Sequence, residues 1–168
     1  MAITKIQSES LNLADDFAFT GTITGAGGTN TPNFLVYQNA NLSIDSNVET
    51  KVNFNSVLYD TASGFNTSTY IYTIPSGQGG KWFLNLKLRK NNFSGNSFRA
   101  IIKVNDSTYL EWDNSSNGDA FTTTNGSIVK NFSAGDYFVC YVKHNDSGTR
   151  QVFSGVNDSF FFGYKIIE

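Results

Sequence analysis

The sequence predicts an all-β protein, built as a sandwich or a barrel. The chain holds 15 Phe and 8 Tyr residues, which favour strands over helices. From Phe34 onward, apolar and polar residues alternate with a period of two, and clusters of Asn, Asp, Ser and Gly interrupt this alternation about every ten residues. With 168 residues the chain has about the length of one domain, which is enough to bury a core.

The first part of the chain differs from the rest. Residues 1–33 contain no Trp or Tyr, and their apolar residues alternate with polar ones only in short bursts, which do not form a core alone. The stretch 21–32 is rich in Gly and Thr, which is typical of a turn and linker. We therefore expect a short extended N-terminal anchor and linker over 1–33, and a separate β domain over 34–168.

Three later segments carry the clearest strand pattern. In 82–89, 98–104 and 137–141, apolar side chains fall on every second position. Such alternation is typical of an antiparallel strand with one face on the core and the other in water. The single cysteine, Cys140, lies in the third of these segments. It excludes an intramolecular disulfide and is interpreted as a small buried hydrophobe.

The last predicted strand, 159–167, is apolar on both faces, so both faces need cover. One face carries larger residues, Phe160, Phe162, Tyr164 and Ile166, and the other carries Phe161, Gly163 and Ile167. We expect the second group to pack against an identical subunit, because those side chains would otherwise form an exposed apolar patch. The alternative is that a loop or the N-terminal extension covers them.

Several motifs resemble the globular head of complement's first component. They are spread over roughly 34–168 and keep the order Tyr-Asp, Pro, Gly-Asp and Phe-x-Phe-Gly, as in Tyr59-Asp60, Ile74-Pro75, Gly135-Asp136 and Phe160–Gly163. This resemblance implies a ten-stranded jelly-roll sandwich and a homotrimer, both shared with tumour necrosis factor.

The N-terminal segment has a resemblance of its own. Residues 4–27 are similar to the openings of virion and tail-fibre-like proteins of marine bacteriophages. This implies that 1–33 binds other virion proteins and docks the β domain 34–168, which we call the knob, onto a particle assembled in the host cytoplasm. The opening residues also lack the apolar segment of a signal peptide, which fits a protein that leaves the cell by lysis.

Charge and composition weigh against several partners. Lys and Arg total 12 against 14 Asp and Glu, so no positive excess is present to neutralise nucleic-acid phosphates. Lys87, Arg89 and Lys90 are interpreted as a solvated strand face, with single-stranded nucleic acid binding as the alternative. No run approaches the roughly 20 apolar residues that span a bilayer, so we expect no membrane insertion.

The sequence offers little catalytic chemistry. Gly80-Lys81 is followed by Trp82 rather than Ser or Thr, so it is not a phosphate loop. His144 is the single histidine and is expected at the surface or at a subunit contact. The run Asp113–Asp119 begins like a calcium loop, but Thr124 stands where a bidentate acid is needed. We expect no catalytic residue and no cofactor; a polar turn is the favoured interpretation of 113–119, with a weak calcium site as the alternative.

These observations lead to a functional hypothesis. The protein is expected to be a non-enzymatic virion structural protein, a trimeric fibre or decoration knob that contacts the host surface. The alternative is a secreted or cell-surface complement-like binding module, and the third possibility is a polysaccharide-degrading enzyme.

The expected contact surface lies at the end of the knob farthest from the anchor. The connections 91–97, 113–119 and 145–158 meet there, and they are rich in Asn, Ser and Gly. A glycan or a protein of the host is the expected ligand, and simple decoration of the particle is the alternative. The side chains expected to anchor the ligand are Phe93, Trp112, Arg150 and Phe153.

Overall fold

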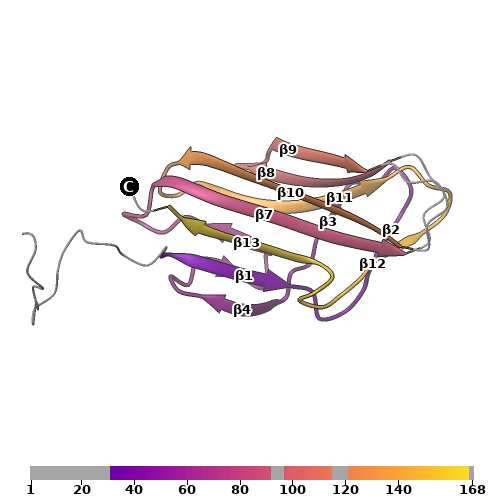
Figure 1. Cartoon of the computed structure of the whole chain (residues 1–168), viewed down its shortest axis with the longest axis horizontal. Helices are drawn as coiled ribbons and strands as arrows, with labels where there is room; N and C mark the ends of the chain where they lie inside the picture. The colour runs from indigo at the N-terminus through magenta and orange to yellow at the C-terminus, as the bar shows by residue number, and fades with distance from the viewer. Residues whose placement is uncertain (1–30, 92–96, 115–120, 167–168) are drawn as a thin grey trace, which may run out of the picture.

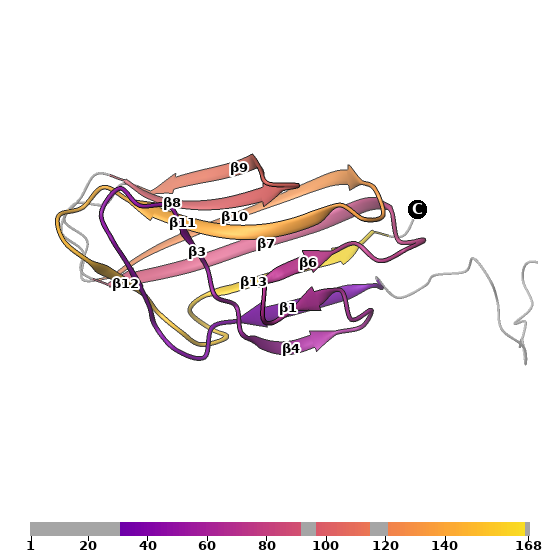
Figure 2. The ribbon, with the colours of Figure 1, turned by 180° about the vertical axis from the view of Figure 1, so that it is seen from behind.

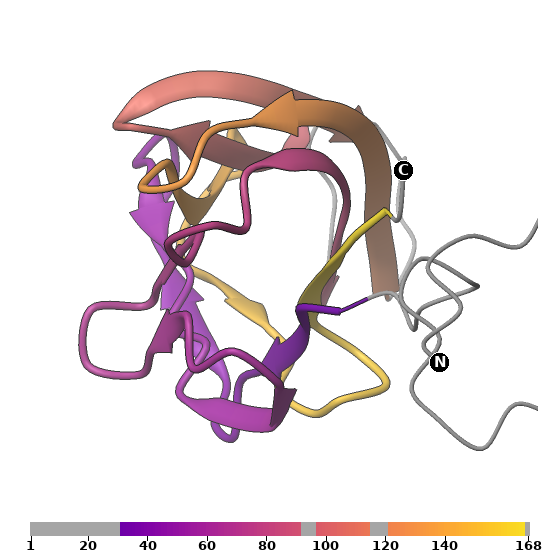
Figure 3. The same ribbon diagram turned by 90° about the vertical axis from the view of Figure 1, so that its left-hand side faces the viewer.

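The computed structural model describes residues 31–91, 97–114 and 121–166, which form two antiparallel β-sheets packed face to face (Figure 1). Within these ranges, no helix could cross a membrane. Seen from one end, the strands surround the interior (Figure 3). Buried hydrophobic side chains fill this interior.

The first sheet has the strand order β2-β12-β7-β13-β1-β4. Strands β12 and β13 pair with successive parts of one edge of β7, and β10 pairs with the opposite edge. Strand β4 pairs with β1 and forms one border of this sheet. The bounds of these strands are Asn33–Tyr37 (β1), Leu42–Ile44 (β2), Ser56–Asp60 (β4), Gly80–Asn91 (β7), Phe121–Phe132 (β10), Arg150–Val152 (β12) and Phe160–Lys165 (β13).

The second sheet has the order β5-β6-β11-β8-β9, with β3 paired to β11, and it faces the viewer in Figure 2. Its strands are Thr50–Lys51 (β3), Phe65–Asn66 (β5), Ile71–Thr73 (β6), Phe98–Val104 (β8), Ser107–Asn114 (β9) and Tyr137–His144 (β11). The described ranges thus hold thirteen strands, of which β3 and β5 have two residues each. The last strand, β13, lies between β1 and β7. This topology confirms the predicted all-β jelly roll.

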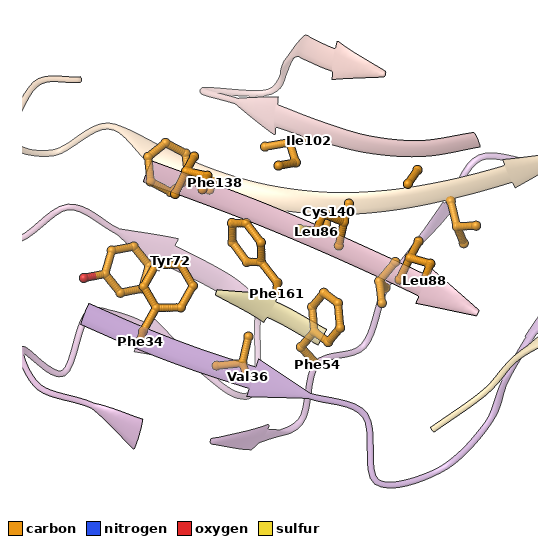
Figure 4. Close-up of a cluster of buried hydrophobic side chains, with 14 of the residues drawn as sticks. Phe34, Val36, Phe54, Tyr72, Leu86, Leu88, Ile102, Phe138, Cys140 and Phe161 are labelled. Carbon is orange, nitrogen blue, oxygen red and sulfur yellow. The ribbon is translucent and has the colours of Figure 1, made fainter. Parts of the chain in front are cut away.

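Aromatic and aliphatic side chains from both sheets fill the core. On β7, the predicted alternation is confirmed, because Trp82, Leu84, Leu86 and Leu88 are all fully buried. Phe34 stacks on Tyr72 with ring centroids 4.0 Å apart, so β1 of the first sheet contacts β6 of the second (Figure 4). Cys140 is also buried in this cluster, as predicted, and its burial raises the pKa of the thiol well above its ordinary value.

The two faces of β13 are exchanged relative to the prediction. Phe161 is only 1% exposed and lies between the sheets, with its ring 5.1 Å from that of Phe34. Gly163 is buried too, and a Cβ there would lie 2.7 Å from Leu84 Cδ2. This face can turn inward because residue 163 is a glycine, since Leu84 and Phe34 leave no room for a side chain there. The prediction that Phe161 and Gly163 contact a second subunit is therefore wrong, and Ile167 lies outside the described residues.

The strand directions define two ends of the sandwich. Strand β1 begins and β13 ends at one end, which we call the base, and β7 ends and β10 begins at the opposite end, which we call the tip (Figure 1). The connection Asn145–Thr149 between β11 and β12 lies at the tip. The strand ends that flank 92–96 and 115–120 lie there as well, although those two segments are outside the described residues.

The burial of Phe161 gives a direct test of the corrected faces. Replacing Phe161 with Ala removes a ring that packs against the buried rings of Phe34 and Phe54, so we expect a loss of about 3–5 kcal/mol in the free energy of unfolding. The control Leu58→Ala, on the exposed part of β4, should cost less than about 1 kcal/mol. Denaturant unfolding at a fixed protein concentration measures both, and equal losses would contradict the assignment.

Candidate functional site

An aromatic cluster covers the outer face of β7 and β13. The ring of Phe83 stacks on Tyr164 at 5.1 Å and lies 5.6 Å from Phe162, which in turn is 5.9 Å from Phe160. All four side chains are half-buried in the single chain. We call these four residues the outer aromatic face. It faces away from the core, because the opposite positions of both strands carry the core residues.

Neighbouring strands extend this apolar surface. Val129 of β10 pairs directly with Phe83, and its side chain is exposed. On the other side, Leu35 of β1 pairs with Phe162 and with the exposed Tyr59 of β4. Residues that are directly opposite in an antiparallel pair share a face of the sheet. The result is a continuous apolar band across five strands, which is larger than the scattered apolar residues of an ordinary monomer surface.

A second group, the Arg89 cluster, lies toward the tip on the same sheet. The guanidinium carbon of Arg89 is 4.6 Å from the centre of the Phe121 ring and 5.7 Å from that of Phe153. Its Nη1 is 2.6 Å from Asp158 Oδ1, so the carboxylate holds the guanidinium against the rings. The two rings are 5.7 Å apart, and Phe121 is 54% exposed. The cluster therefore presents a flat aromatic side chain and a cation at the surface.

The structure separates the predicted contact residues. Phe153 belongs to the Arg89 cluster, and Phe93 lies outside the described residues. Trp112 instead packs on the inward face of β10, where a Cβ at Gly126 would come within 1.8 Å of its indole. Arg150 is bound by Asp146, with 2.6 Å between Nε and Oδ2. Trp112 and Arg150 thus have contacts within the fold.

Sequence reasoning missed Phe121. It stands just after the 113–119 connection, at the start of an alternating run whose exposed positions continue with Thr123 and Asn125. An exposed Phe in such a polar run is a signal that could have pointed to it.

Two residues that the sequence placed outside, Lys90 and His144, are buried at the tip, beside the buried Asp146 and the half-buried Arg150. Lys90, His144, Asp146 and Arg150 form what we call the tip cluster, around the ends of β7, β11 and β12. Lys90 was predicted on a solvated face, but it is fully buried, and its Nζ lies 4.9 Å from the centre of the Phe98 ring. Burial lowers the pKa of Lys90 to about 7, and the nearby Asp146 only partly opposes this effect.

His144 is also buried, at 1% exposure, so the prediction of a surface or subunit-contact role is wrong. It is the last residue of β11, and its ring turns inward, where Nε2 lies 3.1 Å from the carbonyl oxygen of Ile44. That carbonyl belongs to β2, which lies at the border of the first sheet.

The candidate metal ligands are only partly described. The Asp113 carboxylate accepts hydrogen bonds from Ser97 Oγ at 2.8 Å and from Arg99 Nε at 3.2 Å. Residues 115–120 lie outside the described part, so the calcium alternative for 113–119 stays untested. Among the described residues, no group of three His, Cys, Asp or Glu side chains is arranged to hold a metal ion.

An open groove of about 660 Å3 lies at the base, beside the turn where Thr61 N donates to Asn33 O. The side chains that line the groove are short and mostly apolar or hydroxylated, and they belong to residues 62–64, 73–76 and 134–135. None of these lining residues is acidic or basic.

No family model and no curated protein sequence matches this chain. Solved structures do match. The fold is that of the C1q and TNF heads. The globular domain of zebrafish complement 1qA is similar with a TM-score of 0.59 and 16% identity, over 82% of this chain and 98% of that chain.

Two further structures are similar to the same degree. The Eiger TNF of S. frugiperda has a TM-score of 0.62 and 13% identity, over 81% of this chain and 91% of its own. Murine APRIL also has a TM-score of 0.62, with 12% identity, over 80% of this chain and 98% of its own. At such low identity these matches establish the jelly-roll fold.

The buried Lys90 predicts a pH dependence with a definite sign. A lysine whose folded-state pKa is about 7 releases its proton on folding, whereas the unfolded chain keeps it up to about pH 10. The free energy of unfolding should therefore rise as the pH increases from 7 to 10. In Lys90→Met this rise should be smaller, and the variant should gain most stability over the wild type below pH 7. Identical slopes in urea unfolding series of both proteins would contradict the prediction.

Proposed function

We propose that this protein is a non-enzymatic, homotrimeric binding knob on a bacteriophage particle, and that its tip contacts the host surface. The observation that carries the proposal is the outer aromatic face. Four half-buried rings on β7 and β13, extended by Leu35 and Val129, form an apolar surface that identical subunits would cover. The fold shared with complement 1q and TNF structures supports a recognition module rather than an enzyme.

The direction of the chain supports an anchored knob. Strand β1 begins with Asn33 at the base, and the Arg89 cluster lies toward the tip. An N-terminal segment attached to a particle would thus hold the tip outward. The resemblance of residues 4–27 to bacteriophage virion proteins supports the identity of that particle.

The Arg89 cluster supports contact with a glycan or protein of the host. Exposed aromatic rings stack on the apolar faces of sugar rings, and Arg and aromatic residues are frequent anchors at protein interfaces. Asp158 already orients the guanidinium of Arg89, so little conformational freedom is lost on binding.

The alternative is a secreted or cell-surface complement-like module, which the similarity to the zebrafish complement 1qA domain favours. Immunogold electron microscopy of intact phage particles separates the two. Label at regular positions on the particle supports the virion knob, and unlabelled particles with the protein in the medium support the alternative.

Trimer assembly can be tested by placing a charge on the outer aromatic face. In Phe162→Glu a carboxylate would be buried without a partner at the subunit contact, at a cost of several kcal/mol. Light scattering after gel filtration should show three chains for the wild type and one folded chain for the variant. Val48→Glu, on an exposed residue away from this face, is the matched control and should stay trimeric. A monomeric wild type would rule out the assembly.

Host contact can be tested on the Arg89 cluster. Replacing both Phe121 and Phe153 with Ala removes the two rings, and we expect adsorption of particles to host cells to slow by at least about tenfold. The double variant Val48→Ala and Leu58→Ala, which also shortens two exposed apolar side chains, should adsorb like the wild type. If the ring variant assembles and adsorbs normally, the protein decorates the particle without contacting the host.

A further inference from the structure

The hydrogen bonds of His144 define its protonation state. The backbone N–H of Asp146 donates to Nδ1 at 3.2 Å, so Nδ1 has no proton. Nε2 therefore carries the proton and donates it to the carbonyl oxygen of Ile44 at 3.1 Å. Both ring nitrogens of this buried imidazole are satisfied only in the neutral form.

Through these bonds His144 holds the tip loop, which we define as Asn145–Thr149. The loop and the strand end before it are attached to the turn after β2, because Asn47 N donates to His144 O at 2.6 Å and Thr149 Oγ1 donates to Asp45 Oδ1 at 2.8 Å. Inside the loop, the Asp146 carboxylate accepts from Ser147 N at 2.9 Å and from Arg150 Nε at 2.6 Å. The imidazole thus joins the start of the tip loop to a strand about 100 residues earlier.

The charges around His144 oppose its protonation. Lys90 of β7 and Arg150 of β12 face it with positive charge, and Asp146 faces it with negative charge. Arg99 and Lys143 line with it a cavity of about 110 Å3. Burial lowers the pKa of His144 below its ordinary value, the hydrogen bond to Ile44 O opposes this effect, and Lys90 and Arg150 add to it. A proton on Nδ1 would also face the Asp146 N–H and break that hydrogen bond.

We propose that His144 is an acid-sensitive switch: protonation of Nδ1 breaks the hydrogen bond from Asp146 N–H, while Nε2–H stays on Ile44 O, so that the start of the tip loop is released from the imidazole. The surface at the tip then differs between neutral and acidic solution. This goes beyond the proposed function and does not depend on it, because the switch needs only the single folded chain. The folded chain binds the proton more weakly than the unfolded chain, so the free energy of unfolding falls as the pH drops below 6.5.

The single histidine makes the test direct, because its imidazole gives one set of nuclear magnetic resonance signals. On isotope-labelled protein at pH 8, the nitrogen shifts should show the neutral ring with its proton on Nε2. On acidification, the ring and the amides of Asp146 and Ser147 should shift with one common midpoint below pH 6.5. Exchange of the Asp146 amide with solvent, corrected for its intrinsic pH dependence, should become at least about tenfold faster across that midpoint.

The variant His144→Asn supplies the control. Its side-chain oxygen can accept from Asp146 N–H as Nδ1 does, but it does not titrate in this range. The Asp146 and Ser147 amides of the variant should therefore show no transition below pH 6.5. The proposal is overturned if the wild-type ring titrates without a response of these amides, or if the variant shows the same transition. If the variant does not fold, the wild-type titration alone decides between these outcomes.

Discussion

The alternation of side chains along β7 is the constraint on which the rest of the structure depends. One face of this 12-residue strand supplies the centre of the core, from Trp82 to Leu88, and continues to the buried Lys90. The other face supplies Phe83 to the outer aromatic face and Arg89 to the tip. Because β10 pairs along one edge of β7 and β13 and β12 along the other, the same strand also sets the register of its neighbours.

The sequence predicted the parts of the fold that depend on local pattern. The period of two identified β7, β8 and β11 and the buried Cys140, and the order of the motifs from Tyr59-Asp60 to Phe160–Gly163 pointed to the jelly roll. The faces of β13 could not be assigned in the same way, because a strand that is apolar on both sides has no polar face to mark the outside. Which face of β13 turns inward depends on the packing at Gly163, where Leu84 and Phe34 fill the space that a side chain would need.

The sites depend on contacts between distant segments, which a single sequence does not reveal. The Arg89 cluster joins β7, β10 and the connection from β12 to β13, and the tip cluster joins the ends of β7, β11 and β12. Lys90 and His144 were placed at the surface because charged and polar residues are usually found there. Trp112 lies beside the 113–119 connection, and nothing in the sequence shows that its ring packs over Gly126.

The position of the one thiol has a practical consequence. Cys140 lies on the central strand of the second sheet, it is 2% exposed, and burial keeps it in the unreactive thiol form. A reagent reaches its sulfur only when the two sheets separate. The chain therefore contains a natural chemical reporter of opening, and the rate at which a thiol reagent labels it in native buffer measures how often the sandwich comes apart.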